Sequence, residues 1–509
     1  MIDLTVAQIA TIVGGEFADI AAQAAAELHV TGTVEFDSRK VTPGGLFLAL
    51  PGARSDGHDH AASAVAAGAV AVLAARPVGV PAIIVNPVAP QAQAWDGLAS
   101  VLEHDTDGSG AAVLAALAKL AAAVATELVA GGLTIVGITG SSGKTSTKDL
   151  LAAVLQPLGE VVAPPGSFNN ELGHPWTVLR ATEATDYLIL ELSARHRGNI
   201  AALAAIAPPA IGVVLNVGTA HLGEFGSREA IAQTKSELPQ SVPRSGVVVL
   251  NVDDAAVAAM AKVTAARVVR VSRHSQTDAG PADVWAGPVA LDELARPRFT
   301  LHWADGAVEV RLAVHGEHQV GNALCAAAVA LECGATTEQV SMALAGAGPV
   351  SQHRMRVSTR ADGVTVIDDA YNANPDSMRA GLQALSWISR SSEAGRRRSW
   401  AVLGEMAELG EDAISEHDRI GRLAVRLDVS RLIVVGMGRS MSAMHHGAVT
   451  EGARGSEGEK VAAIVADADA ALALLRAELQ PGDVVLVKAS NVAGLGVLAD
   501  TLVAEGNIP

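Results

Sequence analysis

The feature that most constrains the fold is a strand, a glycine-rich bend and a helix in direct succession at residues 134–155. The mostly apolar TIVGIT is followed by GSSG, and the helix then opens with Lys144 and Thr145. Glycines let backbone N–H groups converge on a phosphate, and the helix N-terminus adds its dipole. Lys144 can reach the outer phosphates and Thr145 can bind Mg²⁺. The segment therefore predicts a nucleotide-phosphate site within an α/β sheet.

This loop departs from the strict P-loop pattern by one position. The pattern requires a glycine five residues before Gly143, and that position is Ile138. The alternative is a glycine-rich turn with a solvated lysine, but the flanking strand and helix and the Lys-Thr pair together favour the nucleotide site. The candidate nucleotide-binding residues are Gly140, Ser141, Ser142, Gly143, Lys144, Thr145 and Ser146.

The rest of the chain continues the alternation of strands and helices. Apolar stretches such as DYLILEL, AIGVVLNV and SGVVVLNV alternate with helical segments, which predicts a mostly parallel sheet covered by helices. Residues 281–314 predict antiparallel strands, 317–347 a helical region, and the strand–helix rhythm restarts beyond it. We expect three α/β domains, at 1–107, 108–348 and 349–509, the central one a P-loop ATPase and the last Rossmann-like.

The net charge, the apolar stretches and the cysteines of the chain limit the partners and the location that can be expected. The 509-residue chain has a net charge of −17 at pH 7, which argues against nucleic acid as a partner. The apolar stretch 111–130 contains Lys119 and Glu127, which argues against membrane insertion. No signal peptide is recognisable, and Cys325 and Cys333 read as buried fillers rather than a disulfide framework. We expect a cytoplasmic protein and a monomer.

Two side chains that follow apolar strands could bind a metal together with Thr145. Glu191 ends DYLILEL, and His221 lies in the loop after AIGVVLNV. The carboxyl ends of parallel strands open toward ligands, and Mg²⁺ prefers oxygen ligands. Each residue alone is also compatible with a structural role, as a helix cap or a solvated loop histidine. Because both accompany the phosphate loop, we expect both to be linked to metal.

Taken together, the motifs resemble those of the Mur ligases, ATP-dependent amide ligases of peptidoglycan precursor synthesis. TGSSGKTSTKDL is similar to their ATP loop, and NVGTAHLGEFGSREAIAQTKSEL to the segment with the metal-linked histidine and a carbamylated lysine. The resemblance maps that lysine to Lys235, whose carbamate could bridge a second Mg²⁺. It implies that Lys144, His221 and Lys235 are catalytic. Without the resemblance, Lys235 reads as an exposed helical lysine.

Two stretches resemble the substrate-binding parts of the family. FDSRKVTPGGLFLALPGA is similar to a UDP-binding domain, which implies that Ser38 and Arg39 face the nucleotide, since an arginine fork suits a diphosphate. The alternative is a simple turn after a strand. SFNNELGHPWTVLR resembles the segment that contacts the UDP-sugar peptide, which implies Asn169, Asn170 and Thr177. Loop asparagines are otherwise mostly turn formers.

The stretch VIDDAYNANPDSMRAGLQAL most resembles the family member that adds D-alanyl-D-alanine to UDP-N-acetylmuramoyl-tripeptide; the D-N-P-R motif of the preceding ligase does not occur. The pair Asn374 and Pro375 could also simply start a helix. GEHQVGNALCAAAVAL and RMRV resemble segments that contact ATP. The residues implied by these stretches are Asp369, Tyr371, Asn372, Asn374, His318, Asn322 and Arg354.

The chain departs from the usual family pattern at Ser193 and Asn199, and again at Ala489 and Asn491, which weakens the expectation of a role for the loop 488–491. The resemblance implies that the tripeptide carboxylate attacks the γ-phosphate of ATP, with two Mg²⁺ ions, and that the amine of D-alanyl-D-alanine then displaces phosphate. The third residue of the peptide, lysine or diaminopimelate, stays open.

Two other functions are compatible with parts of the sequence. Folylpolyglutamate synthetases share the ATP-binding and C-terminal domains, but they lack a counterpart of the first hundred residues. A non-catalytic nucleotide-binding protein could use the same fold, but it would not need Lys144, Glu191, His221 and Lys235 together.

Overall fold

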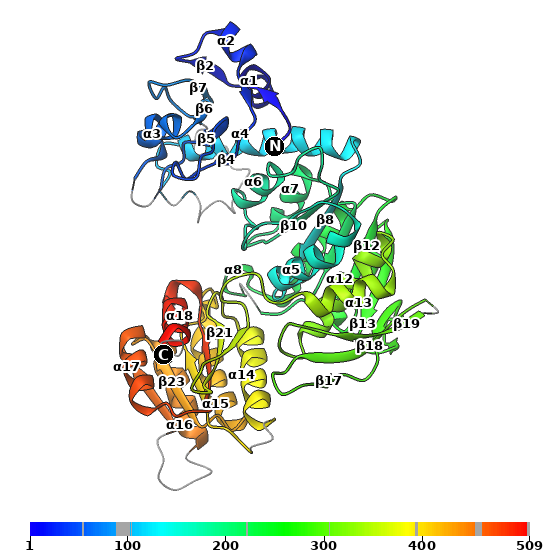
Figure 1. Cartoon of the computed structure of the whole chain (residues 1–509), viewed down its shortest axis with the longest axis vertical. Helices are drawn as coiled ribbons and strands as arrows, with labels where there is room; N and C mark the ends of the chain where they lie inside the picture. The colour runs from blue at the N-terminus through cyan, green and yellow to red at the C-terminus, as the bar shows by residue number, and fades with distance from the viewer. Residues whose placement is uncertain are drawn as a thin grey trace.

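The computed structural model describes residues 1–52, 55–87, 102, 104–219, 222–304, 306–391, 395–452 and 461–505. Three main sheets follow one another along the chain, and the domains built on them lie in a row from the N-terminal to the C-terminal end (Figure 1). The predicted α/β fold with three domains is confirmed.

The N-terminal domain is built on a five-stranded sheet that is parallel except for the pair β2–β7. Helix α1 (Val6–Val13) begins with a capping box of Thr5 and Gln8 and ends at Gly14, whose φ is 73°. The strands in spatial order are β2 (Glu16–Ala18), β7 (Ala82–Ile84), β6 (Ala69–Ala74), β5 (Gly45–Leu48) and β4 (Val34–Glu35).

Helix α4 (Ser109–Ala130) connects this domain to the central one (Figure 1). By length and composition it could cross a membrane, but just over half of the relevant window is buried inside the protein. Leu117, Leu120 and Val124 are fully buried in a hydrophobic core that also contains Ile9 of the N-terminal domain and Leu188 of the central sheet. In this structure α4 is therefore the core helix that joins two domains.

The central domain holds a ten-stranded sheet whose parallel part runs from β9 to β16. Strands β16, β17, β18 and β19 pair antiparallel, as predicted for residues 281–314. The strands are β8 (Thr134–Thr139), β9 (Val161–Val162), β10 (Tyr187–Glu191), β11 (Ile211–Val214), β12 (Val247–Asn251), β13 (Arg267–Ser272), β16 (Val284–Ala286), β17 (Ala290–Leu291), β18 (Pro297–Trp303) and β19 (Gly306–Arg311).

Helices cover this sheet. Helix α5 (Lys144–Leu155) follows the phosphate loop and packs against α12 (Gln319–Glu332) and α13 (Thr337–Gly346), the predicted helical region. Cys325 is fully buried within α12, and both cysteine thiols are free. Cys325 is a core filler, as expected, whereas Cys333 is only partly buried against the same core.

The C-terminal domain has a six-stranded sheet, parallel except for the edge pair β20–β21. Separate hydrophobic clusters lie against it, and Ala295, from a turn of the central domain, is buried in one of them. The strands in order are β20 (Arg356–Thr359), β21 (Thr365–Asp369), β25 (Val484–Lys488), β22 (Ser399–Leu403), β23 (Arg431–Val435) and β24 (Ala462–Val465), and the helices are α14 (Pro375–Arg390), α15 (Ala413–Arg426), α16 (Arg439–Gly452), α17 (Ala468–Glu478) and α18 (Leu495–Glu505).

Candidate active site

A cavity of about 510 Å³ lies between the central and C-terminal domains, where the parallel strands of both sheets end. Ligands of α/β proteins bind at this edge of a sheet. Most of the predicted nucleotide and substrate residues meet in its wall: Ser141, Ser142, Gly143, Lys144, Thr145, Ser146, Asn169, Asn170, His318, Asn322, Arg354, Asp369, Tyr371, Asn372 and Asn374.

Several predicted residues do not line this cavity. Gly140 lies behind it, and its carbonyl accepts a hydrogen bond from Lys144 Nζ at 2.7 Å. Thr177 is buried in α6 (Gly173–Val178), where its hydroxyl donates to Gly173 O at 2.7 Å. His221 falls outside the described residues.

Ser38 and Arg39 lie in the N-terminal domain, away from the cavity wall. The Arg39 guanidinium donates through Nε and Nη2 to the two carboxylate oxygens of Asp37, both at 2.8 Å. These hydrogen bonds hold the pKa of Asp37 down at about 2. The Arg39 guanidinium, which was expected to face a diphosphate, is thus hydrogen-bonded to the carboxylate of Asp37.

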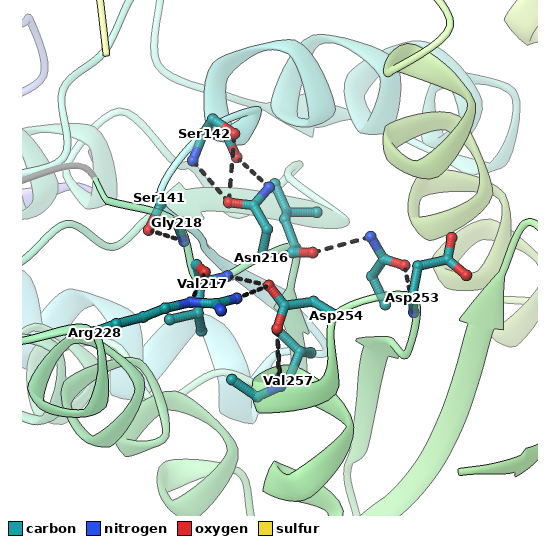
Figure 2. A network of polar contacts seen from close by, with 12 residues as sticks. Ser141, Ser142, Asn216, Val217, Gly218, Arg228, Asp253, Asp254 and Val257 are labelled. Carbon is teal, nitrogen blue, oxygen red and sulfur yellow. Dashed lines mark hydrogen bonds and ion pairs between the residues drawn. The ribbon is translucent and has the colours of Figure 1, made fainter. Parts of the chain in front are cut away.

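The phosphate loop is braced by a residue that the sequence analysis missed, Asn216. Its Oδ1 accepts from Ser142 N at 3.0 Å, and its Nδ2 donates to Ser142 O at 3.1 Å (Figure 2). Gly218 N–H also donates to Ser141 Oγ at 2.9 Å. The signal in the sequence was a polar residue directly after the apolar strand AIGVVL.

The backbone beyond Asn216 is held on both sides. Val217 N–H donates to Asp254 Oδ2 at 2.8 Å, and Arg228 Nε donates to Val217 O at 2.9 Å (Figure 2). Gly143, at the other end of the phosphate loop, has a φ of 84°, and a Cβ there would lie 2.7 Å from Asn322 Oδ1. Both the backbone conformation and the close approach require glycine.

Glu191, at the end of β10, has the features of a metal ligand. It is fully buried, and its Oε2 accepts from Thr145 Oγ1 at 3.3 Å and from Ser167 Oγ at 3.4 Å. Its Oε1 has no partner among the residues that the structure describes. Burial raises the pKa of Glu191, and the cations Lys148 and Lys144 oppose that shift. A buried, unpaired carboxylate oxygen beside a phosphate loop fits a hard cation.

Lys235, at the end of α9 (Arg228–Lys235), is buried, with 7% of its surface exposed. The interpretation of Lys235 as an exposed lysine, made without the resemblance, is wrong: Ile231, one turn earlier on α9, is buried in the hydrophobic core that also contains residues of α4, so this end of α9 faces inward. Burial lowers the pKa of Lys235 well below its usual value, and Lys144 adds to this effect. A neutral amine is the form that can react to give a carbamate.

The C-terminal wall centres on a buried ion pair. Lys488 Nζ lies 2.5 Å from Asp369 Oδ2 and donates to Asn372 O at 2.9 Å. Arg354 stacks over the Tyr371 ring, 4.3 Å from its centre. The departures from the family pattern had weakened the expectation for the loop 488–491, yet three of its members line the cavity: Lys488, Ser490 and Asn491.

The side of the cavity next to α12 is uncharged. His318 lies in the cavity wall and is exposed, and desolvation by the surrounding wall lowers its pKa to about 4, so this histidine is neutral at pH 7. Asn322 is oriented by a hydrogen bond from its Nδ2 to Gln319 Oε1 at 2.9 Å. Asn374 caps α14, with Pro375 in the first turn, so the expected structural role of this pair is confirmed.

Comparison with known proteins agrees with this geometry. Three domain families match: the Mur ligase family, catalytic domain at residues 31–123, the Mur ligase middle domain at 138–330, and the Mur ligase, glutamate ligase domain at 353–491. The chain is 78% identical to the UDP-N-acetylmuramoyl-tripeptide–D-alanyl-D-alanine ligase of Mycobacterium tuberculosis, over 99% of this chain and 98% of that protein. It is 34% identical to the Escherichia coli protein of that name, over 86% of each.

Solved structures agree as well. A crystal structure of MurF from Acinetobacter baumannii matches with a TM-score of 0.78 and 28% identity over 99% of both chains. MurF ligase from Thermotoga maritima in complex with ADP matches with a TM-score of 0.72 and 26% identity, over 94% of this chain and 98% of that one. By domain content, sequence and fold, the chain belongs to the Mur ligase family.

Proposed function

We propose that this chain is an ATP-dependent ligase that joins D-alanyl-D-alanine to UDP-N-acetylmuramoyl-tripeptide, the reaction named for its 78%-identical relatives. The products are the UDP-linked pentapeptide, ADP and phosphate, and the reaction belongs to cytoplasmic peptidoglycan precursor synthesis. One observation carries the proposal: a phosphate loop and the C-terminal wall line one cavity, and the buried carboxylate of Glu191 is hydrogen-bonded to two lining hydroxyls, those of Thr145 and Ser167.

The chemical problem is that a carboxylate must approach a triphosphate, and both are anions. Lys144, the N-terminus of α5 and Arg354 all face the cavity and supply positive charge there. Thr145, Glu191, His221 and a carbamylated Lys235 would hold two Mg²⁺ ions, which when bound neutralise phosphate charge. Positioning by the protein then supplies on the order of 7–11 kcal/mol relative to free encounter.

The substrates are assigned to different walls. The substrate loop (residues 167–171) contains Asn169 and Asn170, which would bind the peptide end of the UDP-linked substrate. Tyr371 and Asn372 face it from the C-terminal domain. Ser38 and Arg39 would bind the uridine diphosphate, and Arg39 must then exchange its Asp37 partner for phosphate oxygens.

The ligase assignment is tested by phosphate release with ATP, Mg²⁺, D-alanyl-D-alanine and UDP-N-acetylmuramoyl-tripeptide, omitting each in turn. We expect release only in the complete mixture, with one phosphate per amide formed. Substrates carrying lysine or diaminopimelate at the third position identify the natural peptide. Release that requires a folate instead of the UDP-linked peptide would favour the folylpolyglutamate synthetase alternative, and no release at all would favour a non-catalytic protein.

The carbamate is tested with Lys235→Ala. We expect this variant to lose activity and to regain part of it when short carboxylic acids are added, because they can occupy the place of the carbamate. Lys262→Ala, at an exposed lysine of the same domain, is the matched control and should be unaffected. Normal activity of Lys235→Ala without any added acid would refute the carbamate.

A further inference from the structure

A second lysine of α5, Lys148, is buried one turn beyond Lys144 and does not line the cavity. Only 2% of its surface is exposed. Burying an ammonium group is costly unless its charge and its donors are satisfied. The question is therefore what the protein gains from a cation at this place, behind the phosphate loop.

The ammonium group of Lys148 joins three separate segments. Its Nζ donates to Pro164 O at 2.8 Å, in the stretch that leads into the substrate loop. It donates to Ser351 Oγ at 3.3 Å, in the linker between the central and C-terminal domains. It also pairs with Asp149 Oδ1 at 2.8 Å, next to it on α5.

On the substrate side, a short chain of hydrogen bonds continues from this point. Ser167 follows residues 164–166 directly, and its hydroxyl donates to Glu191 Oε2 at 3.4 Å. Asn169 Nδ2 donates to Ser167 Oγ at 2.8 Å. A displacement of residues 164–166 would therefore shift the hydrogen-bond partners of both Glu191, the expected metal ligand, and Asn169, an expected peptide-binding residue.

On the linker side, two hydrogen bonds attach Ser351 to α5. Asp149 Oδ2 accepts a hydrogen bond from Ser351 N–H at 3.1 Å, while Lys148 holds the Ser351 hydroxyl. Three residues further along, Arg354 enters the cavity wall. These hydrogen bonds fix the linker, and with it the start of the C-terminal domain, relative to α5.

We propose that Lys148 is a positioning residue that couples the interdomain linker to the substrate loop, so that nucleotide binding and binding of the UDP-linked peptide reinforce each other. The inference rests on the proposed function of the cavity. A lysine that served only to fill space could be replaced by an apolar side chain of similar volume without loss of coupling. Coupling is therefore the property to measure.

The experiment measures the affinity for UDP-N-acetylmuramoyl-tripeptide with and without a non-hydrolysable ATP analogue and Mg²⁺, in the full-length wild type and in Lys148→Met. We expect the analogue to raise the affinity of the wild type about fivefold or more, as is usual for coupled sites, and to leave that of Lys148→Met nearly unchanged. The kcat/KM for the UDP-linked peptide should fall about 10- to 100-fold, the scale of a lost hydrogen bond to a charged group.

Lys119→Met is the matched control, because Lys119 Nζ also donates across a domain junction, to Val13 O at 3.2 Å. Equal coupling in Lys148→Met and wild type, no coupling in the wild type, or the same loss in Lys119→Met would each overturn the inference. Should Lys148→Met fail to fold, Ser351→Ala must weaken the coupling, and unchanged coupling in that variant would overturn it. A wild type that binds neither ligand would refute the proposed function itself.

Discussion

The junction between the N-terminal and central domains is apolar, whereas the junction between the central and C-terminal domains is largely polar. At the first, one continuous hydrophobic core runs through α4, and Trp176 packs on Phe36 and donates to Val34 O at 2.8 Å. At the second, Arg195 Nη2 pairs with Glu408 Oε1 at 2.9 Å, and Lys148 holds the linker.

The difference indicates where the molecule moves. A continuous core resists relative displacement, because opening it would expose apolar surface to water. Polar bonds across a junction can be exchanged for water at small net cost, so relative motion is expected there. The cavity lies at the polar junction. We therefore expect closure around the substrates between the central and C-terminal domains, which would exclude water from the reacting groups.

The largest effect expected is on activity, at the polar junction. Lys144→Ala removes the cation that faces the phosphates and should lower kcat/KM by ~10³-fold or more, the scale found when a group that stabilises the transition state is lost. Thermal unfolding should change little, because Lys144 bonds only to Gly140 O among the described contacts. Substantial ligation by this variant would refute the phosphate assignment.

The next effect sharpens the contrast between the junctions. Trp176→Ala should cost about 3–5 kcal/mol of stability, because it empties a site that is 95% buried within the apolar junction. Trp387→Ala is the control: Trp387 also donates across a junction, to Asp292 O at 2.8 Å, but it is 41% exposed. Denaturant unfolding measures the free energy of unfolding of both variants. An equal loss of stability in the two would contradict the difference between the apolar and polar junctions.

An effect of pH follows from a buried histidine near the apolar junction. Burial lowers the pKa of His174 to about 4, from an ordinary value near 6.5. The unfolded chain therefore binds more protons as the pH falls below 6.5, and stability is lost toward pH 4. From pH 7 to 5 this histidine should cost about 2 kcal/mol. Unfolding of His174→Leu at both pH values checks this, since the variant should lose about 2 kcal/mol less than the wild type.

The smallest effect tests the polar contacts themselves. Arg195→Ala should change stability by less than about 1 kcal/mol, because the ion pair with Glu408 is partly exposed on both sides. The same variant should alter the salt dependence of closure, followed by fluorescence transfer between labels on the two domains. A stability loss as large as that of Trp176→Ala would show that this junction is not built as we describe.

Features that depend on local pattern could be predicted from the sequence. The helix that opens at Lys144, the antiparallel strands after residue 281 and the helix start at Asn374 are examples. In each case the determining residues lie within a few positions of one another, so spacing and residue type carry the information.

Features that depend on distant partners could not be predicted. Lys148 contacts Ser351, 203 residues away, and Asn216 braces a loop 74 residues earlier. Lys235 is buried because α9 packs into a core shared with α4, which no local pattern reveals. The family resemblance supplied the expectation for Lys235 but none for Lys148 or Asn216.

The central claim, that this cavity activates a carboxylate by phosphoryl transfer, is tested most directly by isotope transfer. The terminal carboxylate of UDP-N-acetylmuramoyl-tripeptide is labelled with ¹⁸O, and the phosphate released during ligation is analysed by mass spectrometry. We predict one labelled oxygen in each phosphate for each amide formed, because an acyl phosphate breaks between carbon and oxygen. Amide formation accompanied only by unlabelled phosphate would contradict the account.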